Sequence, residues 1–236
     1  MAYSHSPRIV TDRLILALDA ANSKCYPGSG TVVKDLTGIN SDAAIYSGTT
    51  WDASGYFGFD GTDDALYYPS SSTFNLGTGP ITLEAWSRIY AMGVNNIANI
   101  IVRGNPLCDG CEGGFQLMYS SANSSTISVR FDGTGTIGDL RSVGYTSPTS
   151  FIDGQFHHIV GLRDGVNLKL YLDGQLVASS VNDNQVDVAA NSPVYISGWS
   201  AYRGQMDVAV AKMYDKALSA EEVLQNYNAL KGRFGL

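Results

Sequence analysis

Residues 156–179 read FHHIVGLRDGVNLKLYLDGQLVAS, and this stretch decides between an active site and a piece of β-sheet. In an extended chain successive side chains point to opposite faces, so His158 lies with Phe156 and Val160 while His157 lies on the other face. Two histidines that point in opposite directions cannot bind one metal ion. We therefore interpret both as structural residues of a strand.

The same stretch contains two turn signals. Asp164-Gly165 and Asp173-Gly174 each separate runs in which apolar residues alternate with polar ones. An Asp-Gly pair between such runs is typical of a tight β-hairpin. The stretch therefore predicts three consecutive antiparallel strands.

The composition of the whole chain indicates the same class of fold. The chain has 236 residues, of which 26 are glycine and 16% are charged, against roughly 25% charged residues in an average globular domain. Four of the 22 acidic residues are glutamate and the rest are aspartate, which favours turns over helices. Short strand-like runs recur between Gly, Asp, Asn and Ser, and no linker divides the chain. We predict one all-β domain over residues 1–236, with a core at about 10–231, built as a two-sheet antiparallel jelly-roll sandwich.

One helix is predicted near the C-terminus, at about residues 219–231. The sequence LSAEEVLQNYNALKGRF begins with Ser219 as an N-cap, and Glu222 three residues later completes a capping box. Gly232 is the predicted stop. We expect the helix to pack on the sandwich through one apolar stripe, made of Val223, Leu224, Tyr227 and Leu230.

Charge and hydropathy exclude two classes of partner. The net charge is −7 and no cluster of Lys and Arg is present, so the chain lacks the basic face that nucleic acid requires. No apolar run approaches the roughly 20 residues of a membrane span, so we predict no membrane insertion. The apolar run at residues 14–21 is interrupted by Asp19 and follows Asp12, which is typical of a first strand rather than a signal peptide. We expect synthesis in the cytoplasm without export.

The cysteines give no sign of a metal or redox site. Cys108 and Cys111 form a CDGC sequence that resembles half of a zinc site, but the chain has no second pair. Their surroundings are rich in Pro and Gly, whereas a redox CxxC opens a helix. We interpret the pair as loop residues, either as thiols or as a disulfide, and Cys25 as a partly buried thiol.

Common catalytic motifs are incomplete in this chain. GTGTIG at residues 133–138 matches a dinucleotide-binding pattern, but no helix signal follows it. Glu84 has no carboxylate two or four residues away, whereas a glycoside hydrolase needs two carboxylates across a cleft. Carboxylates from distant loops are the alternative. We predict that the chain is not an enzyme, with polysaccharide cleavage as the less favoured reading.

One acidic loop is a candidate calcium site. FDGTDDALYY at residues 59–68 places Asp60, Asp63 and Asp64 close together, and hard oxygen ligands at such spacing suit Ca²⁺. Aspartates in this pattern are also typical of turns, which is the favoured interpretation. The sequence requires no cofactor and suggests Ca²⁺ as the one candidate.

Several segments in order resemble the laminin-G-like (concanavalin A-like) lectin fold. They are FGFDGTDDALYYP, ITLEAWSR, residues 153–179 and the stretch VYISGWSAYRGQMDVAVAKMYDKALSAEEVLQNY. The resemblance covers about residues 10–231 and is specific for the fold rather than for a ligand. It implies ligand positions on the rim loops.

The resemblance carries the acidic loop and one further aspartate onto this chain, and two aromatic residues are candidates on their chemistry alone. The acidic loop is the local match to the ligand positions of the family. Asp207 matches a frequent Asp of the family that either orients the sheet or binds a ligand. Trp199 and Tyr202 are candidates for stacking on sugar rings, with packing in the core or at an interface as the alternative.

The segments at residues 9–38 and 224–236 look like lectin-like proteins of tailed-bacteriophage virions. This resemblance implies a structural or adhesion protein of the virion, as a capsid decoration or tail component. Its expected partners are other virion proteins, further copies of itself and cell-surface glycans. A stand-alone glycan-binding module is the alternative. The insert GNPLCDGCEGG departs from the family pattern.

Overall fold

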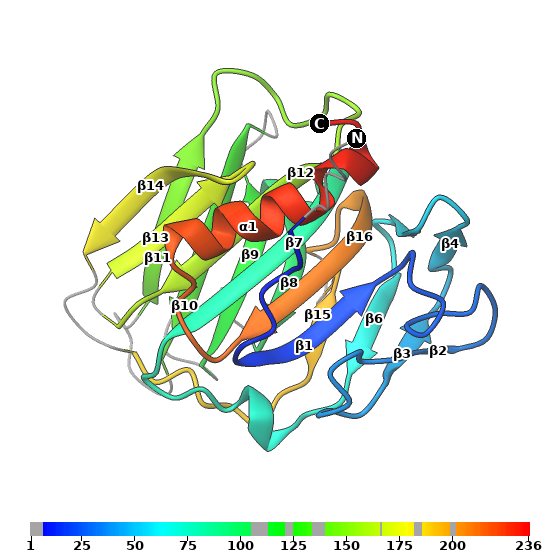
Figure 1. Cartoon of the computed structure of the whole chain (residues 1–236), viewed down its shortest axis with the longest axis horizontal. Coiled ribbons are helices and arrows are strands. Elements are labelled where there is room, and N and C mark those ends of the chain that lie inside the picture. The colour runs from blue at the N-terminus through cyan, green and yellow to red at the C-terminus, as the bar shows by residue number, and fades with distance from the viewer. Residues whose placement is uncertain are drawn as a thin grey trace, which may run out of the picture.

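The computed structural model describes residues 7–104, 113–120, 125–133, 140–165, 167–181, 186–198 and 202–236 (Figure 1). Strands dominate these residues, as the composition predicts. The strands are β1 (Leu14–Asp19), β2 (Val32–Val33), β3 (Ala43–Tyr46), β4 (Thr50–Asp52), β5 (Tyr56–Asp60), β6 (Ala65–Tyr68), β7 (Ile81–Ala91), β8 (Ile97–Arg103), β9 (Gly114–Ser120), β10 (Thr126–Asp132), β11 (Leu140–Thr146), β12 (His157–Arg163), β13 (Asn167–Leu172), β14 (Gln175–Val181), β15 (Val194–Ile196) and β16 (Gln205–Tyr214). The helical elements are η1 (Ser72–Phe74), η2 (Val94–Asn96), α1 (Ala220–Leu230) and η3 (Lys231–Phe234).

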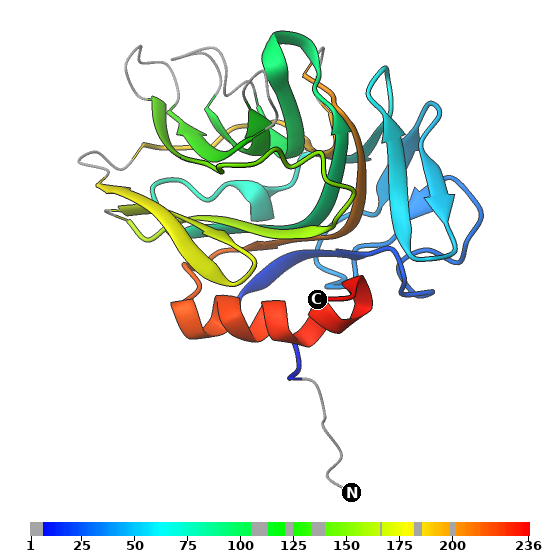
Figure 2. The same ribbon diagram turned by 90° about the horizontal axis from the view of Figure 1, so that it is seen from above.

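The strands form two antiparallel sheets that face each other (Figure 2). Sheet A has the order β14-β13-β12-β7-β16-β5-β4, and β1 pairs with the second half of β16. Sheet B has the order β11-β10-β9-β8-β15-β6-β3-β2. The predicted all-β antiparallel sandwich with one C-terminal helix is confirmed.

Alternation along β7 shows how the sequence builds the sandwich. Ile81, Leu83 and Ala85 point between the sheets and belong to the main apolar core. Glu84 and Trp86 point to the opposite, outer side of sheet A. Sheet A therefore has two buried faces, one against sheet B and one beneath α1.

The histidine stretch forms the strands that the sequence predicts. In β12, His157 pairs with Ser87 and His158 pairs with Trp86, so the two rings lie on opposite faces. Asp173 and Gly174 have φ values of +50° and +80°, as a tight hairpin turn requires. Both histidines are structural parts of sheet A, as predicted.

Helix α1 packs across the outer face of sheet A (Figure 2). Ser219 caps it and forms the predicted capping box with Glu222. The predicted apolar stripe is wrong at Leu224, which is 45% exposed, whereas Asn226 is buried. Hydrogen bonds of Asn226 to the sheet, rather than apolar contact alone, set which face of the helix turns inward.

Helix α1 ends at Leu230, within the predicted range, but Gly232 does not end the helical stretch. The chain continues through this residue in the 3-10 helix η3, and the left-handed residue is Gly235, with φ +78°. The cause lies in packing, because the ring of Phe234 stacks on Trp86 with centroids 4.3 Å apart. None of the helices in the described residues is long and apolar enough to cross a membrane.

Of the three cysteines, the structure describes Cys25. Cys25 is fully buried rather than partly buried, and its Sγ donates to the carbonyl oxygen of Lys34 at 3.2 Å. Burial raises the pKa of this thiol to about 11, which makes it a poor nucleophile. Cys108 and Cys111 lie outside the described residues, and so do residues 134–138 of the GTGTIG motif.

Candidate functional site

The acidic loop lies at the rim of the sandwich, where the chain crosses from one sheet to the other. It joins the end of β5 in sheet A to the start of β6 in sheet B. Gly61 begins the turn with φ +84°, and a Cβ on this residue would lie 2.9 Å from the backbone nitrogen of Gln205. The close approach of β16 therefore requires glycine at this position.

The three predicted calcium ligands lie together. One carboxylate oxygen from each of Asp60, Asp63 and Asp64 lies within 4.8 Å of the others. Asp60 accepts a hydrogen bond from the backbone N–H of Thr62 at 2.7 Å, and Asp63 accepts from the hydroxyl of Ser47 at 2.6 Å. The loop thus holds three carboxylates close together in a folded arrangement.

Asp64 differs from the other two because it is 1% exposed. Its Oδ2 accepts from the backbone N–H of Asp60 at 2.8 Å, and a backbone hydrogen bond from Gly48 also acts on this carboxylate. Burial raises the pKa of Asp64, and the neighbouring charges of Asp60 and Asp63 raise it further, whereas the two backbone hydrogen bonds lower it. A buried carboxylate beside two like charges is costly to ionise, and a bound cation would reduce that cost. The chemistry of the set, hard oxygens at short range, fits Ca²⁺.

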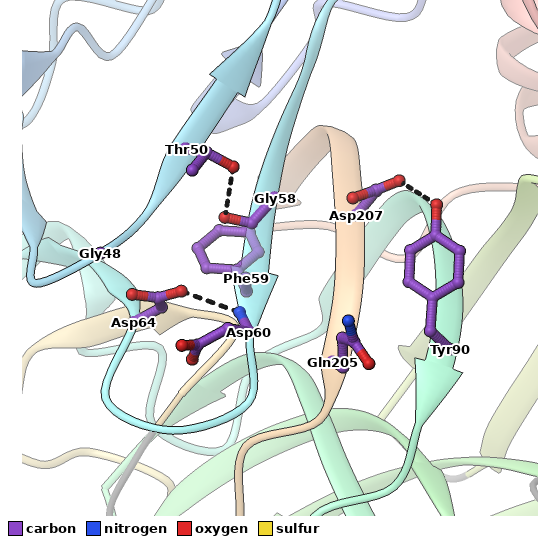
Figure 3. Close-up of a pocket in the computed structure, with 9 residues that line it drawn as sticks. All are labelled: Gly48, Thr50, Gly58, Phe59, Asp60, Asp64, Tyr90, Gln205 and Asp207. Atoms are coloured by element: carbon purple, nitrogen blue, oxygen red, sulfur yellow. Dashed lines mark hydrogen bonds between the residues drawn. The ribbon is translucent and has the colours of Figure 1, made fainter.

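A hollow of about 210 Å³ adjoins the loop (Figure 3). Gly48 forms part of its wall, and a Cβ there would lie 3.1 Å from Asp64 Oδ1, so glycine keeps this side of the carboxylate open. A second hollow of about 420 Å³ shares Asp60 and Gln205 with the first. The first is lined by Gly48, Thr50, Gly58, Phe59, Asp60, Asp64, Tyr90, Gln205 and Asp207.

Asp207 lines the same hollow and also organises sheet A. Its Oδ2 accepts from Arg88 Nη2 at 2.6 Å. The same oxygen accepts from the Tyr90 hydroxyl at 2.6 Å (Figure 3). Burial and the hydrogen bond to Asp207 raise the pKa of Tyr90 to about 12. Arg88 also packs over the ring of Phe156, 4.6 Å from its centroid. The orienting role expected for Asp207 is therefore present, in a position that also faces the hollow.

The predicted sugar-stacking residues have different outcomes. Trp199 lies outside the described residues. Tyr202 is half-buried, and its carbonyl oxygen accepts from the backbone N–H of Asn99 at 3.1 Å. Sequence reasoning missed Tyr90 and Gln205 as lining residues. The alternation in ITLEAWSRIYA places Tyr90 on the outer face of sheet A, but no sequence signal brings that face next to the acidic loop.

Glu84, the isolated glutamate of the sequence, is a structural residue beneath α1. Its Oε1 lies 2.7 Å from Lys212 Nζ and 3.2 Å from His158 Nε2, and its Oε2 accepts from Asn226 Nδ2 at 2.6 Å. Burial alone would raise the pKa of Glu84, but the charge of Lys212 and the contact with His158 lower it to about 2. Because Glu84 has no exposed surface, it cannot meet a polysaccharide in this fold.

Comparison with known proteins identifies structures with a similar fold. No curated protein sequence matches the chain. Three similar solved structures are the binding domain of Paraclostridial Mosquitocidal Protein 1, the binding domain of botulinum neurotoxin DC in complex with rat synaptotagmin II, and Trypanosoma rangeli sialidase. Their TM-scores are 0.66, 0.69 and 0.67, at sequence identities of 14%, 12% and 17%.

These matches cover 92%, 93% and 98% of this chain but 52%, 52% and 36% of the other chains. The chain therefore spans about half or less of the proteins that it matches, and at these identities the likeness shows the fold alone. A sequence profile gives the family directly, since Laminin_G_3, described as "Concanavalin A-like lectin/glucanases superfamily", matches residues 60–224. With more than half of its length matched and the sandwich in place, the chain belongs to the concanavalin A-like lectin/glucanases superfamily.

Proposed function

We propose that this chain is a binding module, without catalytic activity, that holds glycans at the rim of its sandwich with the help of Ca²⁺. The observation that carries this proposal is the buried carboxylate of Asp64, which lines an open hollow and has two like charges beside it. Asp60 and Asp63 stand beside it as exposed carboxylates. A cation at this point would offset three negative charges at once.

In this proposal Asp60, Asp63 and Asp64 hold the ion. Bound Ca²⁺ would supply positive charge and free coordination positions that hydroxyl oxygens of a sugar can fill. The remaining wall of the hollow carries polar side chains at hydrogen-bonding reach of a ligand, namely Thr50, Gln205 and Tyr90.

The test is a glycan array probed in the presence of Ca²⁺ and again after chelation. We expect binding that is lost on chelation and in the Asp60→Asn/Asp63→Asn double variant. The Asp12→Asn variant is the matched control, because its carboxylate is 74% exposed and lies in another part of the molecule. Binding that survives both chelation and the double substitution would contradict the role of the acidic loop.

We propose binding rather than catalysis because the carboxylates of the hollow already hold structural hydrogen bonds. Asp64 bonds the backbone of Asp60, and Asp207 bonds Arg88 and Tyr90. Polysaccharide cleavage is the competing function on the same fold. Release of reducing ends from a polysaccharide, abolished by Asp207→Asn, would establish the enzyme instead.

We further propose that the module is carried by a bacteriophage virion, on the capsid surface or tail. Support comes from the resemblance of residues 9–38 and 224–236 to virion proteins of tailed phages. Many copies on one particle would let weak glycan sites add through avidity. Mass spectrometry of purified virions should find the chain, and electron microscopy should place it. A purified module that binds glycan tightly as a monomer, and a virion without it, would favour the stand-alone alternative.

A further inference from the structure

Three tyrosines from neighbouring strands of sheet B stand side by side. Tyr46 ends β3, Tyr67 lies in β6 and Tyr195 lies in β15, and these strands are adjacent in the sheet. Tyr67 pairs directly with Tyr195, and their ring centroids are 5.4 Å apart. Tyr46 is the diagonal neighbour of Tyr67, with centroids 5.5 Å apart. We call these three residues the tyrosine row.

The tyrosine row faces outward. Leu66 and Ile196 flank it in sequence and point into the core, so alternation turns Tyr67 and Tyr195 away from the core. The side chain of Tyr46 is 49% exposed, and the other two are half-buried. Val32, 48% exposed, and Ala44, also exposed, continue the same face beyond Tyr67. None of these five residues carries a charge.

The tyrosine row begins at the acidic loop. Tyr46 is followed by Ser47, whose hydroxyl donates to Asp63 at 2.6 Å. Tyr67 lies three residues after Asp64 on the strand that the loop opens. The tyrosine row therefore starts next to Asp63, and a ligand that extends from Asp63 onto the outer face of sheet B would meet Tyr46 first.

The size of this surface favours a small, elongated ligand. Three strands span about 10 Å across the sheet. The exposed parts of the tyrosines, Val32 and Ala44 amount to a few hundred Å², on the order of half of the roughly 800 Å² that each partner contributes to a stable protein interface.

The chemistry of the surface favours a neutral sugar chain. Tyrosine offers an apolar ring face and a hydroxyl on the same side chain, which matches the C–H face and hydroxyls of a pyranose ring. The uncharged row offers nothing to a charged group, and the net charge of −7 opposes nucleic acid.

We propose that the tyrosine row is a subsite for a neutral oligosaccharide, continuous with the acidic loop. One sugar unit lies at the loop, and the following units lie across Tyr46, Tyr67 and Tyr195. This inference rests on the proposed glycan-binding function and adds that the ligand is a chain of several units rather than a single sugar.

Calorimetry with glucose and N-acetylglucosamine oligomers of one to four units, in the presence of Ca²⁺, tests the proposal. We expect affinity to rise with length, and Tyr67→Ala and Tyr195→Ala each to reduce the affinity for the longer oligomers about three- to tenfold. The affinity for the single sugar should stay unchanged. Tyr67→Phe keeps the ring face and should retain most of the gain with length.

The controls separate loss of binding from loss of folding. Val181→Ala changes a side chain that is 70% exposed on β14 of the other sheet, and it should leave every affinity unchanged. Tyr46→Ala alters the most exposed ring of the row and should reduce binding without lowering the thermal midpoint.

The outcomes test the tyrosine-row subsite and the proposed function separately. One outcome is oligomer binding that depends on Ca²⁺ but changes neither with oligomer length nor with any of the three tyrosine substitutions. That outcome contradicts a subsite at the tyrosine row and is consistent with the proposed function. Failure of both sugar series to bind wild type overturns the neutral-oligosaccharide subsite, and a glycan array that is also blank overturns the proposed function with it.

Discussion

Glu84 and Asp64 are both carboxylates with almost no exposed surface, but their surroundings differ. Around Glu84, both oxygens have partners, with Lys212 on one and Asn226 on the other. Around Asp64, the hydrogen bonds come from the backbone of Asp60 and Gly48, and the carboxylates of Asp60 and Asp63 are negative neighbours. Glu84 is paired with a cation of the chain itself, whereas in our proposal Asp64 would take its cation from solution.

The two regions differ in the parts of the chain that they hold together. The cluster beneath α1 ties the helix and the N-terminal segment to sheet A, because Asn226 also accepts from the backbone N–H of Val10 at 2.7 Å. The acidic loop is held by hydrogen bonds from Ser47 to Asp63 and from Arg203 to the carbonyl oxygen of Thr62, and it stands beside open hollows. Substitutions in the two regions should therefore have opposite effects on stability.

The largest expected effect is that of Lys212→Met. Removing the ammonium leaves Glu84 as a buried carboxylate without its main charge partner, which should lower the free energy of unfolding by about 3–5 kcal/mol. Urea denaturation measures the loss. Lys169→Met is the matched control, because its ion pair with Asp164 is partly exposed and should contribute less than about 1 kcal/mol. Equal losses in the two variants would contradict the special role of the buried pair.

Acid should act on the same cluster. The pKa of Glu84 is about 2 in the folded chain against 4.5 for a free side chain, so the folded state favours the ionised form. Its contribution, on the order of 3 kcal/mol, is present above pH 4.5 and is lost as the pH falls toward 2. Urea midpoints measured across this window should fall for wild type and change less for Glu84→Gln. Parallel curves for the two proteins would argue against this assignment.

Asp64→Asn should raise the free energy of unfolding, whereas Lys212→Met lowers it. Because burial raises the pKa of Asp64, the folded chain disfavours its ionised form, and this cost is relieved as the pH falls. In a metal-free buffer at neutral pH the variant should be more stable than wild type. Added Ca²⁺ at 100 times its dissociation constant should stabilise wild type by about 2.7 kcal/mol and the variant far less. A variant that is less stable than wild type without metal would contradict the reading of Asp64 as an incomplete site.

The smallest expected effects on stability come from removing single tyrosine hydroxyls, and they differ between two positions. Tyr90→Phe should cost less than about 1 kcal/mol, because Asp207 keeps its bonds to Arg88. Tyr214→Phe should cost more, about 1–2 kcal/mol, because the buried hydroxyl of Tyr214 bonds the carbonyl oxygen of Val10. Thermal unfolding of the two variants gives the order directly, and the reverse order would place the more important hydroxyl at the rim.

The fold followed from the sequence because its signals are local. Alternation placed His157 and His158 on opposite faces, and Asp173-Gly174 predicted the hairpin turn that the structure contains. The capping box at Ser219 fixed the start of α1. The end of α1 at Leu230 also agrees with the predicted range, whereas the continuation through Gly232 into η3 accompanies a contact between Phe234 and Trp86, which are far apart in the chain.

The candidate site was predictable in part for the same reason. Asp60, Asp63 and Asp64 lie close in sequence, so their grouping was visible before the structure. Tyr90 and Asp207 reach the same hollow from strands more than a hundred residues apart, and only the pairing of β7 with β16 joins them. The tyrosine row likewise depends on the order of β3, β6 and β15, which no local pattern specifies.

The strand order has a consequence for how the chain is made. β16 lies between β7 and β5 in sheet A, and β15 lies between β8 and β6 in sheet B, although both come late in the sequence. Neither sheet can close before these strands leave the ribosome, and most of the pairings they make are non-local, which slows folding. We expect the two sheets to close only after β15 and β16 have been synthesised. Until then, the earlier strands have open edges on which chaperones can act.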